Sequence, residues 1–250
     1  MNLHYETVSP LLKETLQKLV NSPIFKDFTL IGGTCLSLQL GHRRSIDIDL
    51  FTDIDYGTMN TKEMKEFIQR SFPYSENTDS LDTSALGYTL YMGDSPIDKI
   101  KVDFFYTEKF IFPIQEIDHI RIADIREIAA MKLSAITEEE PRQKDFWDIH
   151  ELNEKYSFKD MIDWGIKRNE WSVTEEGILN GFQKIDSVKE SPEGIDCFKG
   201  NYWSLVKDDL KETSSVKEEK KTEAIEEKPK EEKVSLKKED KFKVKLDEKK

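Results

Sequence analysis

The sequence predicts an α+β protein with a mixed α/β domain at residues 1–121, a helical domain at residues 122–210 and a disordered tail at residues 211–250. In the first part, apolar and polar residues alternate in several short segments, as they do in strands. After residue 122 the apolar residues recur every three or four positions, which is typical of amphipathic helices. The tail consists of Lys and Glu blocks with almost no apolar residues, so it cannot bury a core.

The mixed α/β part contains recognisable helix N-termini and turns. Ser9 followed by Pro10 is a good N-cap and first turn for a helix. An apolar strand runs into Gly32-Gly33, and a Gly93–Pro96 turn makes the last two strands a hairpin. Helices are therefore expected at residues 8–20, 34–41 and 61–71, the last capped by Thr61, and strands at residues 28–31, 46–51, 86–92 and 99–106.

The second part is helical throughout, with one acidic loop. Glu138-Glu139-Glu140-Pro141 interrupts the helical spacing and separates two helices. Helices are expected at residues 125–136, from residue 144 onward, and at residues 158–168, 174–185 and 201–210. The first half of the chain is thus a mixed unit and the second a helical one.

Charge is unevenly distributed and limits the function classes. Residues 1–210 carry 24 basic and 38 acidic side chains, a formal charge of −14, whereas residues 211–250 are nearly neutral. An acidic body argues against a protein that coats nucleic acid, because such binding needs clustered Lys and Arg. The N-terminus lacks the pattern of a signal peptide, and no apolar run is long enough to cross a bilayer. We therefore expect a cytoplasmic protein with no membrane partner, whose two cysteines are reduced thiols.

Three aspartates in strand patterns indicate a metal site. Asp47 and Asp49 lie two apart in an alternating strand, so both carboxylates point to one face. Asp103 lies in a second alternating strand, between Val102 and Phe104. Clustered carboxylates repel one another, and Mg²⁺ relieves this because it prefers oxygen ligands completed by substrate phosphates. We expect these three acids to hold Mg²⁺, with Asp103 helping to take a proton from the nucleophile.

The glycine pair indicates a phosphate site. Gly32-Gly33 joins a strand to a helix, where the backbone can approach phosphates without Cβ interference. The helix N-terminus adds free N–H groups, and Thr34 can add a hydroxyl. Of Arg43 and Arg44, just before the acidic strand, we assign Arg44 to a nucleotide or RNA phosphate; surface ion pairing is the alternative.

The stretch Leu30–Phe51, LIGGTCLSLQLGHRRSIDIDLF, resembles the first motif of the nucleotidyltransferase superfamily with the DNA polymerase β fold. Within that superfamily it looks closest to the AbiEii/AbiGii toxins of abortive-infection and toxin–antitoxin systems. Residues 130–136 and 144–149 resemble the Lys helix and the Lys/Arg-Asp-x-x-Asp motif of the same family. The resemblance covers roughly residues 10–210 and excludes the tail.

The resemblance implies Mg²⁺-dependent transfer of a nucleotidyl group from an NTP to an acceptor hydroxyl. For related toxins the acceptor is RNA, notably tRNA ends, and a cognate antitoxin is expected as partner. Lys132 would then point at the triphosphate, and Asp145 and Asp148 would organise the site from the helical domain. Snorkelling of Lys132 to solvent, and helix-dipole complementation by Asp145, are the structural alternatives.

One departure from the family pattern leaves other functions open. Relatives carry an Arg in the loop where this chain has Glu138–Pro141, and Arg142 is the candidate replacement. The alternatives are an aminoglycoside-type nucleotidyltransferase, whose cationic substrate would suit an acidic protein, and a non-catalytic nucleotide-binding relative.

Overall fold

The structure is a computed structural model that describes residues 2–190, 195–198, 200 and 202–226. Its contacts divide the chain into two units, Met1–Ser214 and Ser215–Lys250. The fold and the site described below belong to the first unit. The expected change from strands to helices near residue 121 falls inside this unit and is not a boundary between units.

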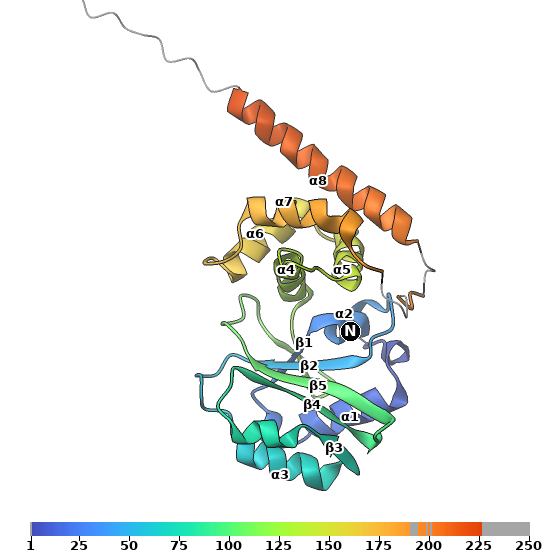
Figure 1. Cartoon of the computed structure of the whole chain (residues 1–250), viewed down its shortest axis with the longest axis vertical. Helices are drawn as coiled ribbons and strands as arrows, with labels where there is room; N and C mark the ends of the chain where they lie inside the picture. The colour runs from blue at the N-terminus through green and yellow to red at the C-terminus, as the bar shows by residue number, and fades with distance from the viewer. Residues whose placement is uncertain (1, 191–194, 199, 201, 227–250) are drawn as a thin grey trace, which may run out of the picture. The chain divides into compact units, whose positions relative to one another are not determined.

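A seven-stranded mixed sheet runs through the first unit between two groups of helices (Figure 1), in the order β3-β4-β5-β2-β1-β7-β6. The β2–β5 pair is parallel, and it places Asp49 opposite Asp103 and Asp47 opposite Lys101. The β4–β5 hairpin and the β1–β2 pair are antiparallel. The strands are β1 (Thr29–Ile31), β2 (Asp47–Thr52), β3 (Tyr74–Glu76), β4 (Gly87–Ser95), β5 (Asp98–Tyr106), β6 (Gln115–Ile117) and β7 (Ile120–Ile122).

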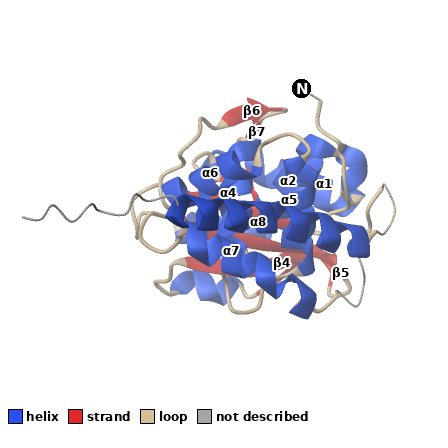
Figure 2. Cartoon of the chain, turned by 90° about the horizontal axis from the view of Figure 1, so that it is seen from above, coloured by secondary structure: helices blue, strands red, loops and turns tan. Residues whose placement is uncertain are grey.

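Helices cover both faces of the sheet. Figure 1 shows α1 and α3 on one side, and α2 with the α4–α7 group on the other. The view in Figure 2 looks down onto the helices of this second group, with the strands behind them. The helices are α1 (Pro10–Val20), α2 (Gly32–Leu40), α3 (Thr61–Ser71), α4 (Ile125–Ala135), α5 (Gln143–Asn153), α6 (Phe158–Arg168), α7 (Glu175–Gln183) and α8 (Trp203–Glu226).

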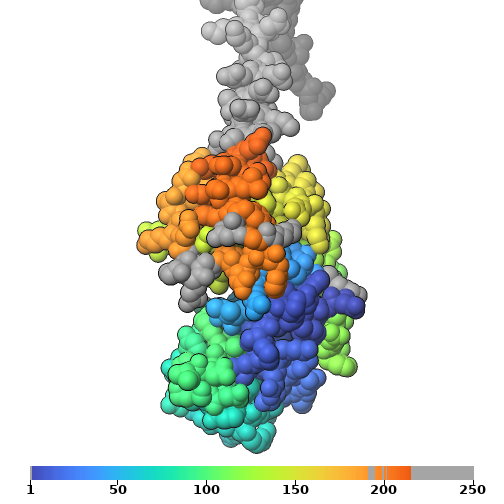
Figure 3. Space-filling model, turned by 90° about the vertical axis from the view of Figure 1, so that its right-hand side faces the viewer, coloured from blue at the N-terminus to red at the C-terminus, as the bar shows by residue number. Residues whose placement is uncertain are grey.

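One hydrophobic core joins the sheet to the helices. The buried face of β2 and β5 contributes Ile48, Leu50, Val102 and Phe104, none of which has measurable exposure. On the helical side, Trp147 of α5 is also fully buried. In Figure 3 the blue N-terminal surface and the yellow and orange helical surface meet within the first unit. The strand residues that do not enter the core are therefore held at a fixed place beneath the helices.

The predicted mixture of sheet and helices is confirmed, and its elements differ from the expectation in detail. Ser9 caps α1 by accepting the N–H of Leu12, as predicted. The cap of α3 is Asn60 and not Thr61, because the Asn60 side chain accepts the N–H of Glu63. The strands β3, β6 and β7 were not predicted, since three residues are too few to show an alternation.

The C-terminal segment departs from the expected boundary at residue 211. Helix α8 continues to Glu226, so the first part of the predicted tail is helical. The remaining tail residues, 227–250, lie outside the described residues. No helix in the described ranges combines the length and the apolar character that crossing a membrane requires.

Candidate functional site

The three predicted acids lie on one face of the sheet. Alternation along β2 buries Ile48 and Leu50 and leaves Asp47 and Asp49 half-buried on the other face. Because β2 and β5 pair in register, Asp103 lies beside Asp49 on that face. The structure thus brings together the acids that the sequence placed on two separate strands.

The surroundings of Asp49 raise the pKa of its carboxyl group. Burial, followed by the neighbouring charge of Asp103, raises the pKa of Asp49 to about 6. Asp47 adds a smaller repulsion, while Lys132 and Lys101 act in the opposite direction. The Asp49 carboxylate therefore sits in a place where its negative charge is poorly compensated.

The other two acids have lysine neighbours. The Asp103 carboxylate accepts a 2.7 Å hydrogen bond from the Thr89 hydroxyl and forms an ion pair with Lys101. Asp47 faces the Lys144 ammonium group at 3.8 Å, which is beyond hydrogen-bond distance. Two lysines thus neutralise part of the charge on the acidic face.

The glycine turn packs directly against the acids. Gly32 has a φ of +70°, a conformation that other residues rarely adopt, and begins α2. A Cβ at Gly32 would lie 2.1 Å from Oδ2 of Asp49. The N-cap of α2 is Ile31, whose side chain has no acceptor to satisfy the first N–H groups of the helix. The turn therefore places an uncapped helix N-terminus next to the acidic face.

Thr34 occupies a supporting position. Its side chain is buried, its Oγ1 lies 2.8 Å from Ser45 Oγ, and it hydrogen-bonds to the main-chain carbonyl of Asp47. These bonds hold the start of β2 against α2. The predicted use of the Thr34 hydroxyl for a phosphate would require it to leave these contacts.

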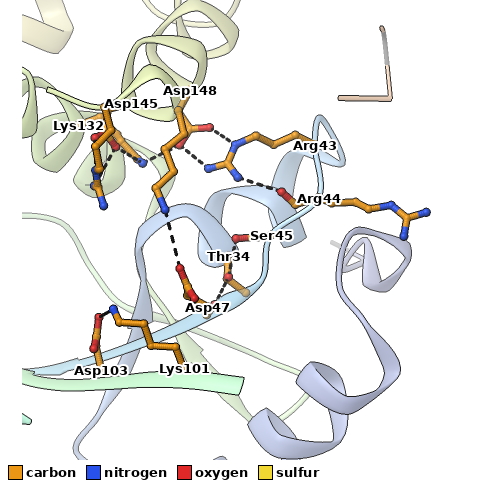
Figure 4. A network of polar contacts seen from close by, with 12 residues as sticks. Thr34, Arg43, Arg44, Ser45, Asp47, Lys101, Asp103, Lys132, Asp145 and Asp148 are labelled. Carbon is orange, nitrogen blue, oxygen red and sulfur yellow. Dashed lines mark hydrogen bonds and ion pairs between the residues drawn. The ribbon is translucent and has the colours of Figure 1, made fainter. Parts of the chain in front are cut away.

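A buried polar network lies on α4 and α5, above the acidic face (Figure 4). Asp148, fully buried, accepts two bonds from Arg43, at 2.7 and 2.8 Å, and one from His42 at 2.9 Å. Lys132 pairs with Asp148 at 2.6 Å and with Asp145 at 2.7 Å. We call these side chains, with Arg142, the Asp148 network.

The charges within the Asp148 network stabilise one another. Burial alone would raise the pKa of Asp148, but Arg43 and Lys132 hold it well below its usual range. Arg142 pairs with Asp145 at 2.8 Å, and its own side chain is 60% exposed. Arg142 therefore connects the buried network to the open side of α5.

Arg44, the predicted phosphate ligand, points away from this network. Its guanidinium pairs with Asp196 at 3.0 Å, and both side chains are more than half exposed. Figure 4 shows Arg43 directed at Asp148 and Arg44 directed outward. The alternative of a surface ion pair thus describes Arg44, while its neighbour Arg43 joins the network.

A cleft of about 830 Å³ opens between the start of β2 and the start of α5. Asp47 lines it from below, and Arg142 and Lys144 line it from the helical side. Acidic residues of the 138–141 loop and of the segment after α7 complete its rim. The further lining residues include Arg43, Arg44, Glu139, Glu140, Glu190 and Asp196. The cleft has the volume of a small-molecule site.

The three acids offer carboxylate oxygens, which are the type of ligand that Mg²⁺ prefers. They supply three carboxylates on one face, and Asp49, whose pKa is raised first by burial and then by the charge of Asp103, would gain a counter-charge from a divalent cation. Within the described part of the chain, no three His, Cys, Asp or Glu side chains are close enough together to hold an ion. Lys101 and Lys144 would have to release Asp103 and Asp47 for the acids to converge.

Sequence reasoning missed several residues that the structure adds to the site. Thr89 and Lys101 hold Asp103, and both come from strands whose outward residues carry no motif. His42 lies in the Asp148 network although it has no partner nearby in the sequence. Lys144 is the first residue of the Lys/Arg-Asp-x-x-Asp motif, which was the available signal, but it was given no role in the site from the sequence.

Comparison with known proteins places this site in context. The family described as "Nucleotidyl transferase AbiEii toxin, Type IV TA system" matches residues 14–187. "Uncharacterized protein aq_aa25" of Aquifex aeolicus (strain VF5) is 33% identical over 173 residues, which are 66% of this chain and 73% of that protein. A crystal structure from H. pylori, described as a candidate nucleotidyltransferase, has a TM-score of 0.54 at 15% identity, covering 85% of this chain and 94% of that one. At this identity the likeness concerns the fold alone.

Proposed function

Because this chain belongs to the AbiEii family of nucleotidyl transferase toxins, we propose that it transfers a nucleotidyl group from an NTP to an acceptor hydroxyl with the help of Mg²⁺. The resemblance seen in the Leu30–Phe51 motif is thereby confirmed at the level of the family. The nucleotide, the metal and the acceptor are the proposal.

The observation that carries the proposal is the opposition of two charged walls. On the sheet side, Asp47 lines the cleft, while Asp49 and Asp103 lie on the same face of the sheet but outside the lining. The cationic side chains of Arg142 and Lys144 line the helical side of the same cleft. A triphosphate with a divalent cation carries both signs of charge, so it complements both walls at once.

The residues of this chain would bind and orient the reactants. The glycine turn, Gly32-Gly33, and the N-terminus of α2 offer N–H groups to the phosphates. Asp103 would accept the proton of the acceptor hydroxyl as its oxygen attacks the α-phosphorus. The bond from that phosphorus to the bridging oxygen breaks, and pyrophosphate leaves. Mg²⁺, when bound by the three acids, would stabilise the negative charge on the phosphates.

The acceptor and the partner follow from the family. We propose RNA, with tRNA ends as the first candidate, as the acceptor that the resemblance to these toxins implies. We also propose that a separately encoded antitoxin restrains this protein, since the family description names a toxin–antitoxin system. Glu139 and Glu140 in the lining of the cleft would pair with a small cationic acceptor, which is the second candidate.

The test is transfer of label from each of the four α-³²P-NTPs to total tRNA with Mg²⁺. The wild type is compared with the double variant Asp47→Ala/Asp49→Ala, and a parallel arm contains an aminoglycoside. Label on RNA with the wild type alone supports the proposal and identifies the nucleotide. Label on the aminoglycoside selects the second candidate. Nucleotide binding without transfer in either arm rejects catalysis in favour of a non-catalytic relative.

A further inference from the structure

Two lysines of the helical side lie near the proposed nucleotide, and their surroundings differ. Lys132 lies between Asp145 and Asp148, with its ammonium group 2.7 and 2.6 Å from their carboxylates. Its side chain is 6% exposed, and it is absent from the lining of the cleft. The Lys132 ammonium group is thus already committed to two short ion pairs inside the protein.

Lys144 directly precedes Asp145 on α5, lies one turn before Asp148, and faces the cleft. Its side chain is 40% exposed and lines the cleft beside Arg142. Among the described residues its acidic neighbour is Asp47, on the opposite wall, at 3.8 Å. A pair that is this long and this exposed contributes about 0–1 kcal/mol, so Lys144 can exchange Asp47 for another anion at little cost.

The electrostatic environments of Lys132 and Lys144 differ, as their exposures do. Three cationic side chains, those of Arg142, Lys132 and Arg43, repel the Lys144 ammonium group, and Asp47 attracts it from 3.8 Å. For Lys132, burial is outweighed by Asp148 and Asp145, so its pKa is raised. The positive charge of Lys144 therefore lacks compensation that an anion in the cleft would supply.

We propose that Lys144, and not Lys132, is the lysine that contacts the triphosphate, and that Lys132 is a positioning residue that acts through Asp145 and Asp148. This inference rests on the proposed function, because it assumes a nucleotide in the cleft. In the free protein the Lys144 ammonium group spans the cleft to Asp47. When the nucleotide binds, this group turns to the phosphates and releases Asp47.

The experiment measures nucleotide affinity and not only activity. Binding of each NTP and of its monophosphate is measured in the presence of Mg²⁺ for the full chain and for four variants. Lys144→Ala removes the ammonium group, and Lys144→Arg keeps the charge. Lys132→Met removes the buried charge. Lys159→Ala is the matched control, since Lys159 is an exposed helix lysine, paired with Asp163, away from the cleft.

The expected result is selective loss of triphosphate affinity in Lys144→Ala. Its Kd for the NTP should rise roughly tenfold, which corresponds to about 1.4 kcal/mol, while its Kd for the monophosphate and its melting temperature stay near those of the wild type. Lys144→Arg should recover most of the triphosphate affinity. Lys132→Met should instead lower the melting temperature, because it leaves two buried carboxylates with fewer partners. Lys159→Ala should match the wild type in every respect.

Two outcomes would overturn the inference alone. One is a Lys144→Ala protein that binds the triphosphate as tightly as the wild type does. The other is a Lys132→Met protein that keeps its melting temperature but loses the preference for triphosphate over monophosphate. If the wild type itself binds none of the four NTPs, the proposed function fails and this inference fails with it. Wild-type binding therefore tells the two failures apart.

Discussion

Replacing Asp148 by asparagine should destabilise the protein strongly, although the substitution changes neither the size nor the shape of the side chain. Asp148 has no exposure, and it receives the guanidinium of Arg43 through two hydrogen bonds. It also receives the ammonium group of Lys132 at 2.6 Å and the ring of His42 at 2.9 Å. The amide group introduced by Asp148→Asn would carry no charge, so Arg43 would be buried without its anion.

The magnitude follows from the burial of the partners. The Arg43 side chain is 5% exposed and that of Lys132 is 6% exposed, so water cannot replace the lost carboxylate. Removing one member of a buried ion pair costs about 3–5 kcal/mol. Lys132 keeps its second partner, Asp145, so we expect the lower half of that range. For a unit of this size, such a loss lowers the melting temperature by roughly 6–15 °C.

The difference in stability between the wild type and the Asp148→Asn variant should also depend on pH, and it should be smaller at low pH. The pKa of Asp148 is held well below its usual range in the folded state. A carboxyl group with a depressed folded-state pKa contributes stability above its unfolded pKa, which is about 4, and loses it as the pH falls toward the folded value. The stabilisation by Asp148 should be complete at pH 6–7 and should shrink below about pH 4.

Thermal and urea unfolding of both proteins at pH 7 and at low pH would measure the effect. Asp163→Asn is the matched control, because Asp163 forms an exposed pair with Lys159 and should change stability by less than about 0.5 kcal/mol. An Asp148→Asn protein that unfolds within about 1 kcal/mol of the wild type at pH 7 would refute the reasoning. In that case the buried charges would not depend on Asp148 for their stability.

Three further predictions concern single positions. Arg43→Ala should lower stability by about 3 kcal/mol or more because it leaves Asp148 without its main partner. Arg44→Ala should change stability by less than about 0.5 kcal/mol, since the ion pair of Arg44 is exposed. Urea unfolding of both variants at pH 7 measures this contrast, and equal losses of stability would contradict the prediction. Gly32→Ala should abolish label transfer and lower the melting temperature, because its Cβ would lie 2.1 Å from the Asp49 carboxylate at a positive φ; a variant with normal transfer would show that the turn can move. Ser9→Ala should cost about 1 kcal/mol by removing the cap of α1, which a melting curve would detect, and transfer activity should be unaffected.

Much of the fold was predictable because its signals are local. The alternation along β2 and β5 and the helical spacing of α4 and α6 follow from which neighbours in the sequence share a face. The Ser9 cap needs only residues within one turn. The strands β3, β6 and β7 and the Asn60 cap were missed, since such short features compete with several equally good local choices.

The sequence by itself determined the family, the mixture of sheet and helices, and the three acids that lie on one face of the sheet. Those acids are specified by the period of the strand, which is a property of consecutive residues. Tertiary structure alone decided which cation meets which anion: Arg43 and not Arg44 enters the network, and Lys132 is buried between two aspartates while Lys144 lines the cleft. The physical reason is that burial and pairing depend on side chains about 100 residues apart, as with Arg43 and Asp148, and no local pattern records how such segments pack together.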